Sequence, residues 1–322
     1  LTAALFLSAL TGTDSASVSA KDFRGKTITL QEPARRIVCL IESGLSGLYM
    51  LGAGEQVVGV SANVYATGVN RWYGALDQRL REKQLPAPGN WDFVSLESVL
   101  ALRPDLVLIW SEQTETIAAL EARDIPVFAV SLKSIDDVYQ EIEELGRLTG
   151  REARAAEIIA WTKGELARFT ARIPTDVNRP GLYYMWAQGD LETSCGGSTV
   201  NDLISMAGGR NVCGQLHKEH TTLSREHLLS WNPEVLVMWY NERKSPKDIL
   251  ADPQWKNVAA VRQGRVHEFP EVFLCDLWTL KFVHAVKMVA KWTHPSLFAD
   301  IDLGKEQEEM LLRLYGKKLS RL

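Results

Sequence analysis

Aromatic and hydroxyl side chains recur at the ends of the segments that the sequence predicts to be buried strands. Flat aromatic faces give a large contact area with little rotamer entropy to lose, which suits a planar or ring-bearing ligand. Ligands of open α/β sheets bind beyond the carboxyl ends of the strands, so we expect these side chains to line one cleft. Each aromatic residue alone could equally pack in the core, and the prediction rests on the group. The members that follow strands are Ser43, Trp110, Ser111, Trp186, Ser198, Thr199, Trp239 and Tyr240, and Tyr65 joins them from the long loop 62–90.

Signatures of catalysis are missing from the sequence. It contains no G-x-S-x-G, no G-x-x-x-x-G-K-[ST] and no H-E-x-x-H. We therefore predict a binding protein with no catalytic residues and no cofactor, and keep an exported α/β enzyme as the alternative. A bare metal ion is disfavoured as the ligand, because the histidines are scattered along the sequence. His217 and His220 share a loop, and the sequence leaves open whether they contact a ligand or are solvated.

An oxyanion ligand such as molybdate also remains open. Ser43 and the stretch 196–199 precede or begin predicted helices, where backbone N–H groups gather on an anion. The case for a strongly anionic ligand is weak, however, because Arg71 and Arg243 are the only loop arginines expected near the cleft.

The elements that must position these residues alternate between strands and helices. This order predicts an α/β fold with two Rossmann-like lobes, whose parallel central sheets are covered by helices on both faces. Strands are expected at 36–41, 57–60, 105–110 and 126–130 in the first half and at 181–186, 234–239 and 265–269 in the second. Helices are expected at 44–52, 96–102, 114–123, 134–149, 198–207, 225–230 and 278–293.

An internal repeat supports the division into two lobes. SLESVLALRPDLVLIW (95–110) and SREHLLSWNPEVLVMW (224–239) have the same length and align without gaps. In each, a serine is placed to cap a short helix, a proline ends the helix, and a buried strand follows. We expect one such helix–strand unit in each lobe.

Between the repeats, residues 151–172 are rich in Ala, Glu and Arg and contain no proline. A single helix of this length would be about 33 Å long and could run along both lobes. The predicted organisation is a truncated signal peptide (1–20), an N-terminal lobe (21–150), a connecting helix (151–173) and a C-terminal lobe (174–322).

Composition and compartment narrow the class of protein. The chain of 322 residues carries a net charge of −4, which gives no indication of nucleic acid or of an anionic membrane surface as partner. The apolar run 1–10 is too short to span a bilayer, and the small residues before Lys21 fit a signal-peptidase site, so we expect export to the periplasm or the exterior without membrane insertion. Four cysteines (Cys39, Cys195, Cys213 and Cys275) allow three full pairings; the pair 195–213 would close the shortest loop, and the sequence does not choose among them.

Together these features resemble the class III substrate-binding proteins of ABC importers, which serve the uptake of iron–siderophores, cobalamin, haem and some oxyanions. The likeness runs from RIVCLIESGLSGLYMLGAGEQVVGV (36–60) through ETSCGGSTVNDLISMAGGRNV (192–212) to KWTHPSLFADIDL (291–303). It implies that Trp91 and Trp278 stand where relatives place aromatic residues against the ligand. It also implies that Glu97 and Glu226, the acidic residues of the two repeats, dock onto arginines of the permease dimer.

From this resemblance we expect a monomeric solute-binding protein that delivers a metal chelate, most of all a ferric siderophore, to an ABC importer. Cobalamin, haem, and molybdate or tungstate are the alternative ligands. A haem scavenger or adhesin of the same fold would have no need of the paired Glu97 and Glu226.

Overall fold

A computed structural model describes residues 17–66 and 68–319 of the chain. Each half of the chain builds one four-stranded, all-parallel sheet. The N-terminal sheet contains β3 (Ile37–Cys39), β4 (Val57–Val60), β5 (Leu106–Trp110) and β6 (Val127–Val130), in the order β4-β3-β5-β6. The C-terminal sheet contains β7 (Gly181–Met185), β9 (Arg210–Asn211), β11 (Val235–Met238) and β12 (Val266–Glu268), in the order β12-β11-β7-β9.

The two sheets have the same topology. If the strands of each sheet are numbered in the order in which they occur along the chain, both sheets have the spatial order 2-1-3-4. Strands β3, β5, β7 and β11 are buried along their length, except for the half-buried Trp110 at the end of β5. Their continuous apolar sequences fit a parallel sheet that helices cover on both faces. The predicted α/β fold with two lobes is confirmed.

The sequence repeat corresponds to one structural unit in each lobe. Helix α4 (Leu96–Ala101) leads into β5, and α9 (Arg225–Trp231) leads into β11. The hydroxyl of Ser95 accepts from the N–H of Ser98, and the hydroxyl of Ser224 accepts from the N–H of His227, so both helices are capped in the same way. Each lobe thus contains one serine-capped helix that leads into a central strand.

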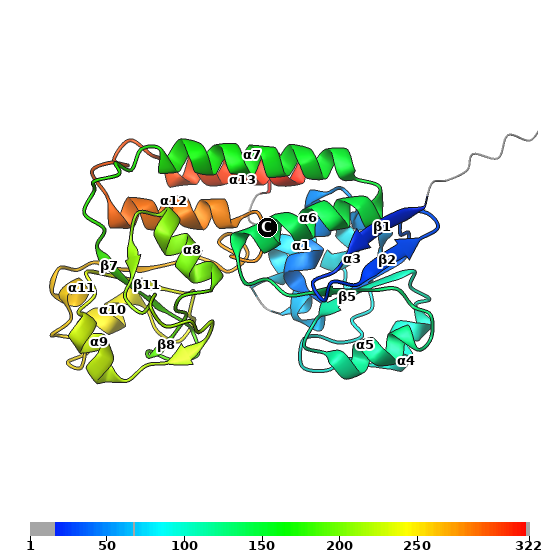
Figure 1. Cartoon of the computed structure of the whole chain (residues 1–322), viewed down its shortest axis with the longest axis horizontal. Coiled ribbons are helices and arrows are strands. Elements are labelled where there is room, and N and C mark those ends of the chain that lie inside the picture. Colours follow the sequence, from blue (N-terminus) through cyan, green and yellow to red (C-terminus); the bar gives the residue numbers. More distant parts are fainter. Residues whose placement is uncertain (1–16, 67, 320–322) are drawn as a thin grey trace, which may run out of the picture.

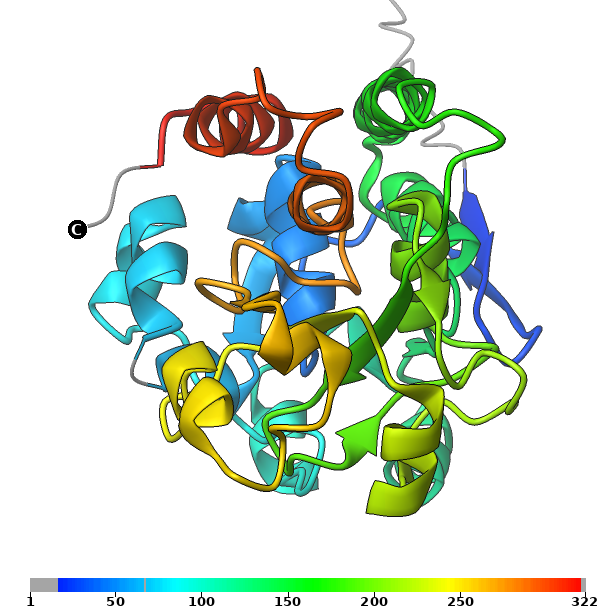
Figure 2. The ribbon, with the colours of Figure 1, turned by 90° about the vertical axis from the view of Figure 1, so that its left-hand side faces the viewer.

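A long helix, α7 (Glu152–Thr170), passes from one lobe to the other along one side of the molecule, with α13 (Leu303–Tyr315) beside it and α12 (Phe282–Thr293) beneath both (Figures 1 and 2). It follows α6 (Ile135–Thr149), which ends at Gly150 in the left-handed conformation. The lobes are therefore joined by one long helix, as predicted.

The hydrophobic core is continuous between the lobes. One cluster of buried side chains includes strands of both sheets together with α1 (Glu42–Met50), α12 and α13. At the boundary, the ammonium group of Lys281 donates to Ser46 Oγ at 2.9 Å and to Tyr315 OH at 3.3 Å, and all three residues are buried. This packing limits the lobes to small relative movements.

An N-terminal hairpin spans the predicted boundary at residue 20. Strand β1 (Val18–Lys21) pairs antiparallel with β2 (Thr27–Leu30), and the backbone N–H of Lys21 donates to the Glu144 carboxylate on α6. Cleavage after Ala20 would remove three of the four β1 residues, because this strand runs from Val18 to Lys21. The residues before 17, which hold most of the predicted signal peptide, lie outside the described part of the chain.

Several shorter elements complete the lobes. The predicted loop 62–90 contains three short helices, and a two-stranded antiparallel ribbon of β8 and β10 lies beside the C-terminal sheet. Their bounds, with those of the remaining helices and strands, are η1 (Gly54–Gln56), η2 (Ala62–Tyr65), α2 (Asn70–Leu76), α3 (Gln78–Arg81), α5 (Thr114–Glu121), β8 (Glu192–Thr193), α8 (Thr199–Met206), β10 (Thr221–Thr222), α10 (Pro246–Ala251) and α11 (Ala259–Arg262). Within residues 17–66 and 68–319, none of the helices has the length and apolar character needed to span a bilayer.

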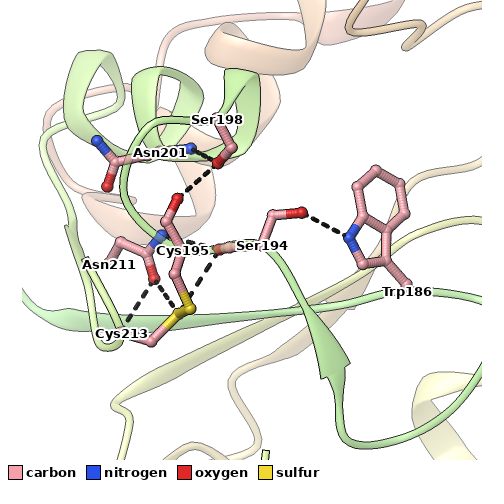
Figure 3. The surroundings of a disulfide bond; sticks show 7 residues. All are labelled: Trp186, Ser194, Cys195, Ser198, Asn201, Asn211 and Cys213. Carbon is pink, nitrogen blue, oxygen red and sulfur yellow. Dashed lines mark hydrogen bonds between the residues drawn. A yellow bond between two sulfur atoms is a disulfide. The ribbon is translucent and has the colours of Figure 1, made fainter. Parts of the chain in front are cut away.

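Cys195 and Cys213 form a disulfide, while Cys39 and Cys275 are free and buried. The disulfide joins the loop before α8 to the segment that follows β9, and Asn211 and Ser194 lie around it (Figure 3). The hydroxyl of Ser194 accepts a hydrogen bond from the indole N–H of Trp186 at 2.8 Å. The bridge therefore fixes a segment that in turn orients Trp186.

Candidate functional site

A cavity of about 580 Å³ lies between the lobes, at the carboxyl ends of the central strands. Both lobes contribute to its wall, which is mostly apolar and aromatic. The lining residues are Glu42, Ser43, Asn63, Ala66, Val69, Tyr73, Trp91, Trp110, His220, Val272, Phe273, Asp276 and Trp278.

The N-terminal lobe presents the first turn of α1 to this cavity. Two residues separate the end of β3 from the start of α1, so α1 begins directly at the edge of the sheet. The carboxylate of Glu42 accepts a hydrogen bond from the Ser61 hydroxyl at 2.7 Å, and its backbone carbonyl accepts one from Tyr73 at 2.6 Å. The hydroxyl of Ser43 is buried and has no hydrogen-bond partner among the described residues. A buried hydroxyl without a partner is costly, and a ligand in the cavity would supply one.

The C-terminal lobe presents a layered aromatic wall. Trp278 faces the cavity, and Trp186 stacks behind it with ring centroids 6.0 Å apart and an angle of 9° between the planes. Trp239 packs edge-on against both indoles. The imidazole of His220 lies 5.1 Å from the Trp186 ring and also lines the cavity. Trp186 and Trp239 are buried, so they support the wall from behind.

Phe273 connects the two lobes at the side of the cavity. Trp72, from α2 of the N-terminal lobe, stacks on it at 5.4 Å, and Tyr73 packs against it edge-on at 5.3 Å. Next to this contact, Arg71 forms an ion pair with Glu271 of the other lobe. The Arg71 guanidinium is thus held by a carboxylate and does not line the cavity.

The cavity wall combines the uncharged polar side chains of Ser43, Asn63 and Tyr73 and the imidazole of His220 with two acidic side chains. Glu42 and Asp276 line it, and among the described residues no lysine or arginine does. Burial raises the pKa of Asp276 above its usual value, with Lys281 opposing that effect. Burial also lowers the pKa of Lys281 to about 8. Behind α1, burial and the nearby Asp276 raise the pKa of Glu141 to about 8.

A smaller cavity of about 250 Å³ shares Trp110 and Trp278 with the first. Its other lining residues are Glu112, Ser131, Leu132, Lys133 and Glu219. The two indoles therefore stand between an apolar compartment and a charged one.

The structure brings part of the predicted site together. Ser43, Trp91, Trp110 and Trp278 line the cavity, and Trp186 and Trp239 support its wall. The other predicted residues do not line the cavity. Tyr65 donates to the carbonyl of Leu85, and Ser198 caps α8 and donates to the Cys195 carbonyl. Thr199 is buried in the first turn of α8, and Ser111 and Tyr240 lie outside the cavity wall. Sequence position after a strand did not distinguish a side chain that faces the cavity from one that caps a helix.

Several lining residues were not predicted. The 62–90 loop contributes Asn63, Ala66 and Val69, and its length was the only sequence signal of a functional role. The segment between β12 and α12 contributes Val272 and Phe273. Of the two histidines left open, His220 lines the cavity and His217 does not. No group of three or more potential metal ligands occurs within residues 17–66 and 68–319.

The two predicted docking residues are exposed. Glu97 lies in the first turn of α4 and Glu226 in the first turn of α9. Both helices lie on the side of the molecule opposite α7, one in each lobe (Figure 1). Hydrogen bonds from its own backbone N–H and from Ser224 lower the pKa of Glu226, which keeps it ionised.

Comparisons with known proteins agree with this architecture. The molybdate-binding protein MolA of Haemophilus influenzae is 25% identical over 316 residues, covering 90% of this chain and 88% of that protein. A cobalamin-binding protein of Halobacterium salinarum is 30% identical over 225 residues, 68% of this chain and 58% of that protein. Among solved structures, Helicobacter pylori CeuE with Ni(II) bound matches with a TM-score of 0.79 and 19% identity, covering 94% of this chain and 97% of that one. A family model described as periplasmic binding protein matches residues 37–272. The chain therefore belongs to the periplasmic binding protein family.

Proposed function

We propose that the protein is an extracytoplasmic solute-binding protein that binds a metal chelate, foremost a ferric siderophore, and delivers it to an ABC importer. The observation that carries this proposal is the aromatic cavity shared by both lobes. Its volume lies in the usual range for sites that enclose a whole small molecule, and it is much larger than a bare ion requires. The flat faces of Trp91, Trp110 and Trp278 suit a chelate with planar or apolar surfaces.

Cobalamin is the second candidate ligand. It is also a metal chelate with a flat ring system, and the Halobacterium salinarum relative that is 30% identical bears the name of a cobalamin-binding protein. Molybdate, named for the Haemophilus influenzae relative, fits the cavity less well. A small dianion would meet Glu42 and Asp276 there, with no lysine or arginine among the described lining residues.

Glu97 and Glu226 supply the proposed contact with the permease. Each is an exposed carboxylate at a helix N-terminus, where the helix dipole favours a negative charge, and such a carboxylate can form a bidentate pair with arginine. One lies on each lobe, on the same side of the molecule, so they would fit a permease made of two subunits.

Two measurements test the proposal. Calorimetric titration of the purified protein with ferric siderophores and cobalamins should find at least one that binds. In cells, the double variant Glu97→Lys/Glu226→Lys should abolish uptake of that chelate while its affinity in solution stays unchanged. A matched control is Glu115→Lys/Glu308→Lys, which reverses two other exposed carboxylates and should leave uptake intact. Unchanged uptake in the first variant would overturn the docking role, and failure of every chelate to bind would overturn the proposed function.

A further inference from the structure

The carboxylates of the main cavity face the space that a ligand would fill. Glu42 is fixed by the Ser61 hydroxyl, and Asp276 is fixed by the backbone N–H of Trp278 at 3.0 Å. Neither carboxylate forms a salt bridge with a described residue. They approach the cavity from opposite lobes, so a bound chelate would lie between two acidic groups.

The nearest cations are engaged elsewhere. Arg71 pairs with Glu271 outside the wall. The ammonium of Lys281 donates to Ser46 and Tyr315, and it lies 3.7 Å from the centroid of the Phe273 ring. Lys281 itself does not line the cavity. The positive charge of Lys281 offsets part of the charge of Asp276, but Lys281 offers no donor to a ligand in the cavity.

The smaller cavity, of about 250 Å³, also has more acidic than basic side chains in its wall. Glu112 from the N-terminal lobe and Glu219 from the C-terminal lobe line it, with Lys133 as the one basic residue in its described wall. An arm of the chelate that passes Trp110 and Trp278 would again meet more negative than positive charge.

The buried hydroxyl of Ser43 independently indicates that a ligand occupies this space. Ser43 is 5% exposed, lines the main cavity and has no partner among the described residues. Its O–H can donate to an oxygen at the surface of a chelate, and the oxygens of a metal-bound hydroxamate are acceptors of this kind.

We infer that the cleft selects its ligand by charge and takes a cationic chelate, of the ferric trihydroxamate class, in preference to an anionic one of the tris-catecholate class. This inference rests on the proposed function, whose site it describes further. Four carboxylates from both lobes surround the two compartments, and the flat indoles between them supply contact area that depends little on charge. A cationic chelate gains from each ionised carboxylate in the partly desolvated cleft, whereas an anionic tris-catecholate chelate is repelled by each.

The test compares two ferric chelates of opposite charge. Ferrioxamine B is a cationic trihydroxamate, and ferric enterobactin is an anionic tris-catecholate. Calorimetry with the wild-type protein should show at least about tenfold tighter binding of ferrioxamine B. The double variant Glu42→Gln/Asp276→Asn should reduce that preference by about tenfold, since the amides keep the shape of the wall but not its charge. Glu308→Gln, an exposed substitution on α13, should leave the preference unchanged, and rising salt should weaken binding of the cationic chelate.

The outcomes separate this inference from the proposed function. Tighter binding of ferric enterobactin, or a preference that survives in a folded double variant, would overturn selection by charge while the chelate-binding function stands. If neither siderophore binds, aquocobalamin and cyanocobalamin provide a second matched pair, cationic and neutral around the same corrin. A preference for aquocobalamin that the double variant loses would support the inference, and equal affinities would overturn it. Absence of binding to all four chelates would overturn the proposed function itself, and the inference with it.

Discussion

Arg71 and Glu271 form an ion pair that joins the two lobes beside the cavity. The guanidinium donates to the carboxylate through Nη2 at 2.6 Å and through Nε at 3.2 Å, and the indole N–H of Trp72 donates to the same carboxylate. Glu271 is buried, and it directly precedes the cavity-lining residues Val272 and Phe273. The pair therefore sets the position of one cavity wall relative to α2 of the other lobe.

Replacing Arg71 with alanine should lower the free energy of unfolding by about 1–3 kcal/mol, because the buried Glu271 carboxylate loses its charged partner. The loss is limited because Arg71 is partly exposed, so solvent already screens the pair. Chelate affinity should fall as well, since the Phe273 wall loses an anchor. Urea denaturation and calorimetry would measure the two effects. Arg35→Ala, which removes the exposed pair with Glu32, is the control and should cost less than about 1 kcal/mol. Equal losses in the two variants would contradict an anchoring role for Arg71.

Trp278 is expected to be the main aromatic contact of the ligand. The variant Trp278→Ala removes a face of the cavity and should weaken chelate binding by about 10- to 100-fold, as for a central aromatic anchor. The quenching of tryptophan fluorescence by the chelate should shrink at the same time. Trp161→Ala, on α7 away from the cavity, tests whether the loss is specific. A Trp278→Ala variant that binds as tightly as the wild type would exclude this contact.

The Cys195–Cys213 disulfide should stabilise both the fold and the cavity wall. Its loop spans 18 residues, and closing a loop of this length contributes about 3 kcal/mol to the free energy of unfolding. The double variant Cys195→Ser/Cys213→Ser should lose about that amount and should bind chelate more weakly, because Ser194 no longer holds Trp186 in place behind Trp278. Reductant should weaken the wild type in the same way and leave the double variant unaffected. If reductant weakens both proteins equally, the effect does not arise from this disulfide.

Stability should depend on pH through Glu141. Its pKa is raised from 4.5 to about 8 by burial, so the folded protein keeps a proton that the unfolded chain releases between these values. The unfolded state binds fewer protons in this range, and stability therefore falls as the pH rises, by about 1.4 kcal/mol per pH unit from this one group. The loss is complete above the folded pKa.

The variant Glu141→Gln removes the titrating group and should gain stability relative to the wild type as the pH is raised from about 5 to about 8. Thermal unfolding at several pH values would measure the difference between the two proteins. Asp276, whose pKa is also raised by burial, is present in both proteins. A difference that is independent of pH would show that Glu141 is ionised in the folded protein.

The sequence predicted the fold well because its signals are local and repeated. Apolar runs such as 106–110 become strands wherever helices cover both faces, and the serine-capped helix before each proline recurs in both halves. The β1–β2 hairpin was missed because its first strand is short and built of small residues, and only packing against α6 shows that it belongs to the fold. Helix α13 also went unassigned, although its residues 303–315 are amphipathic.

The candidate site was predicted only in part, and for a physical reason. The sequence places a side chain near the end of a strand, but whether it faces the cavity depends on which neighbour covers it. Trp186 and Trp278 illustrate this point, because they stack as a pair and only the outer indole reaches the cavity. The acidic character of the wall was not foreseen either, because Asp276 comes from an irregular segment with no strand or helix signal.

The hydrophobic core that runs through both halves of the chain makes each half depend on the other for its folding. Each half shows the same strand order, as an ancestral duplication would produce, yet neither half now closes its own interior. Fragments separated at α7 should aggregate or stay unfolded on their own, and the intact protein should melt in a single calorimetric transition.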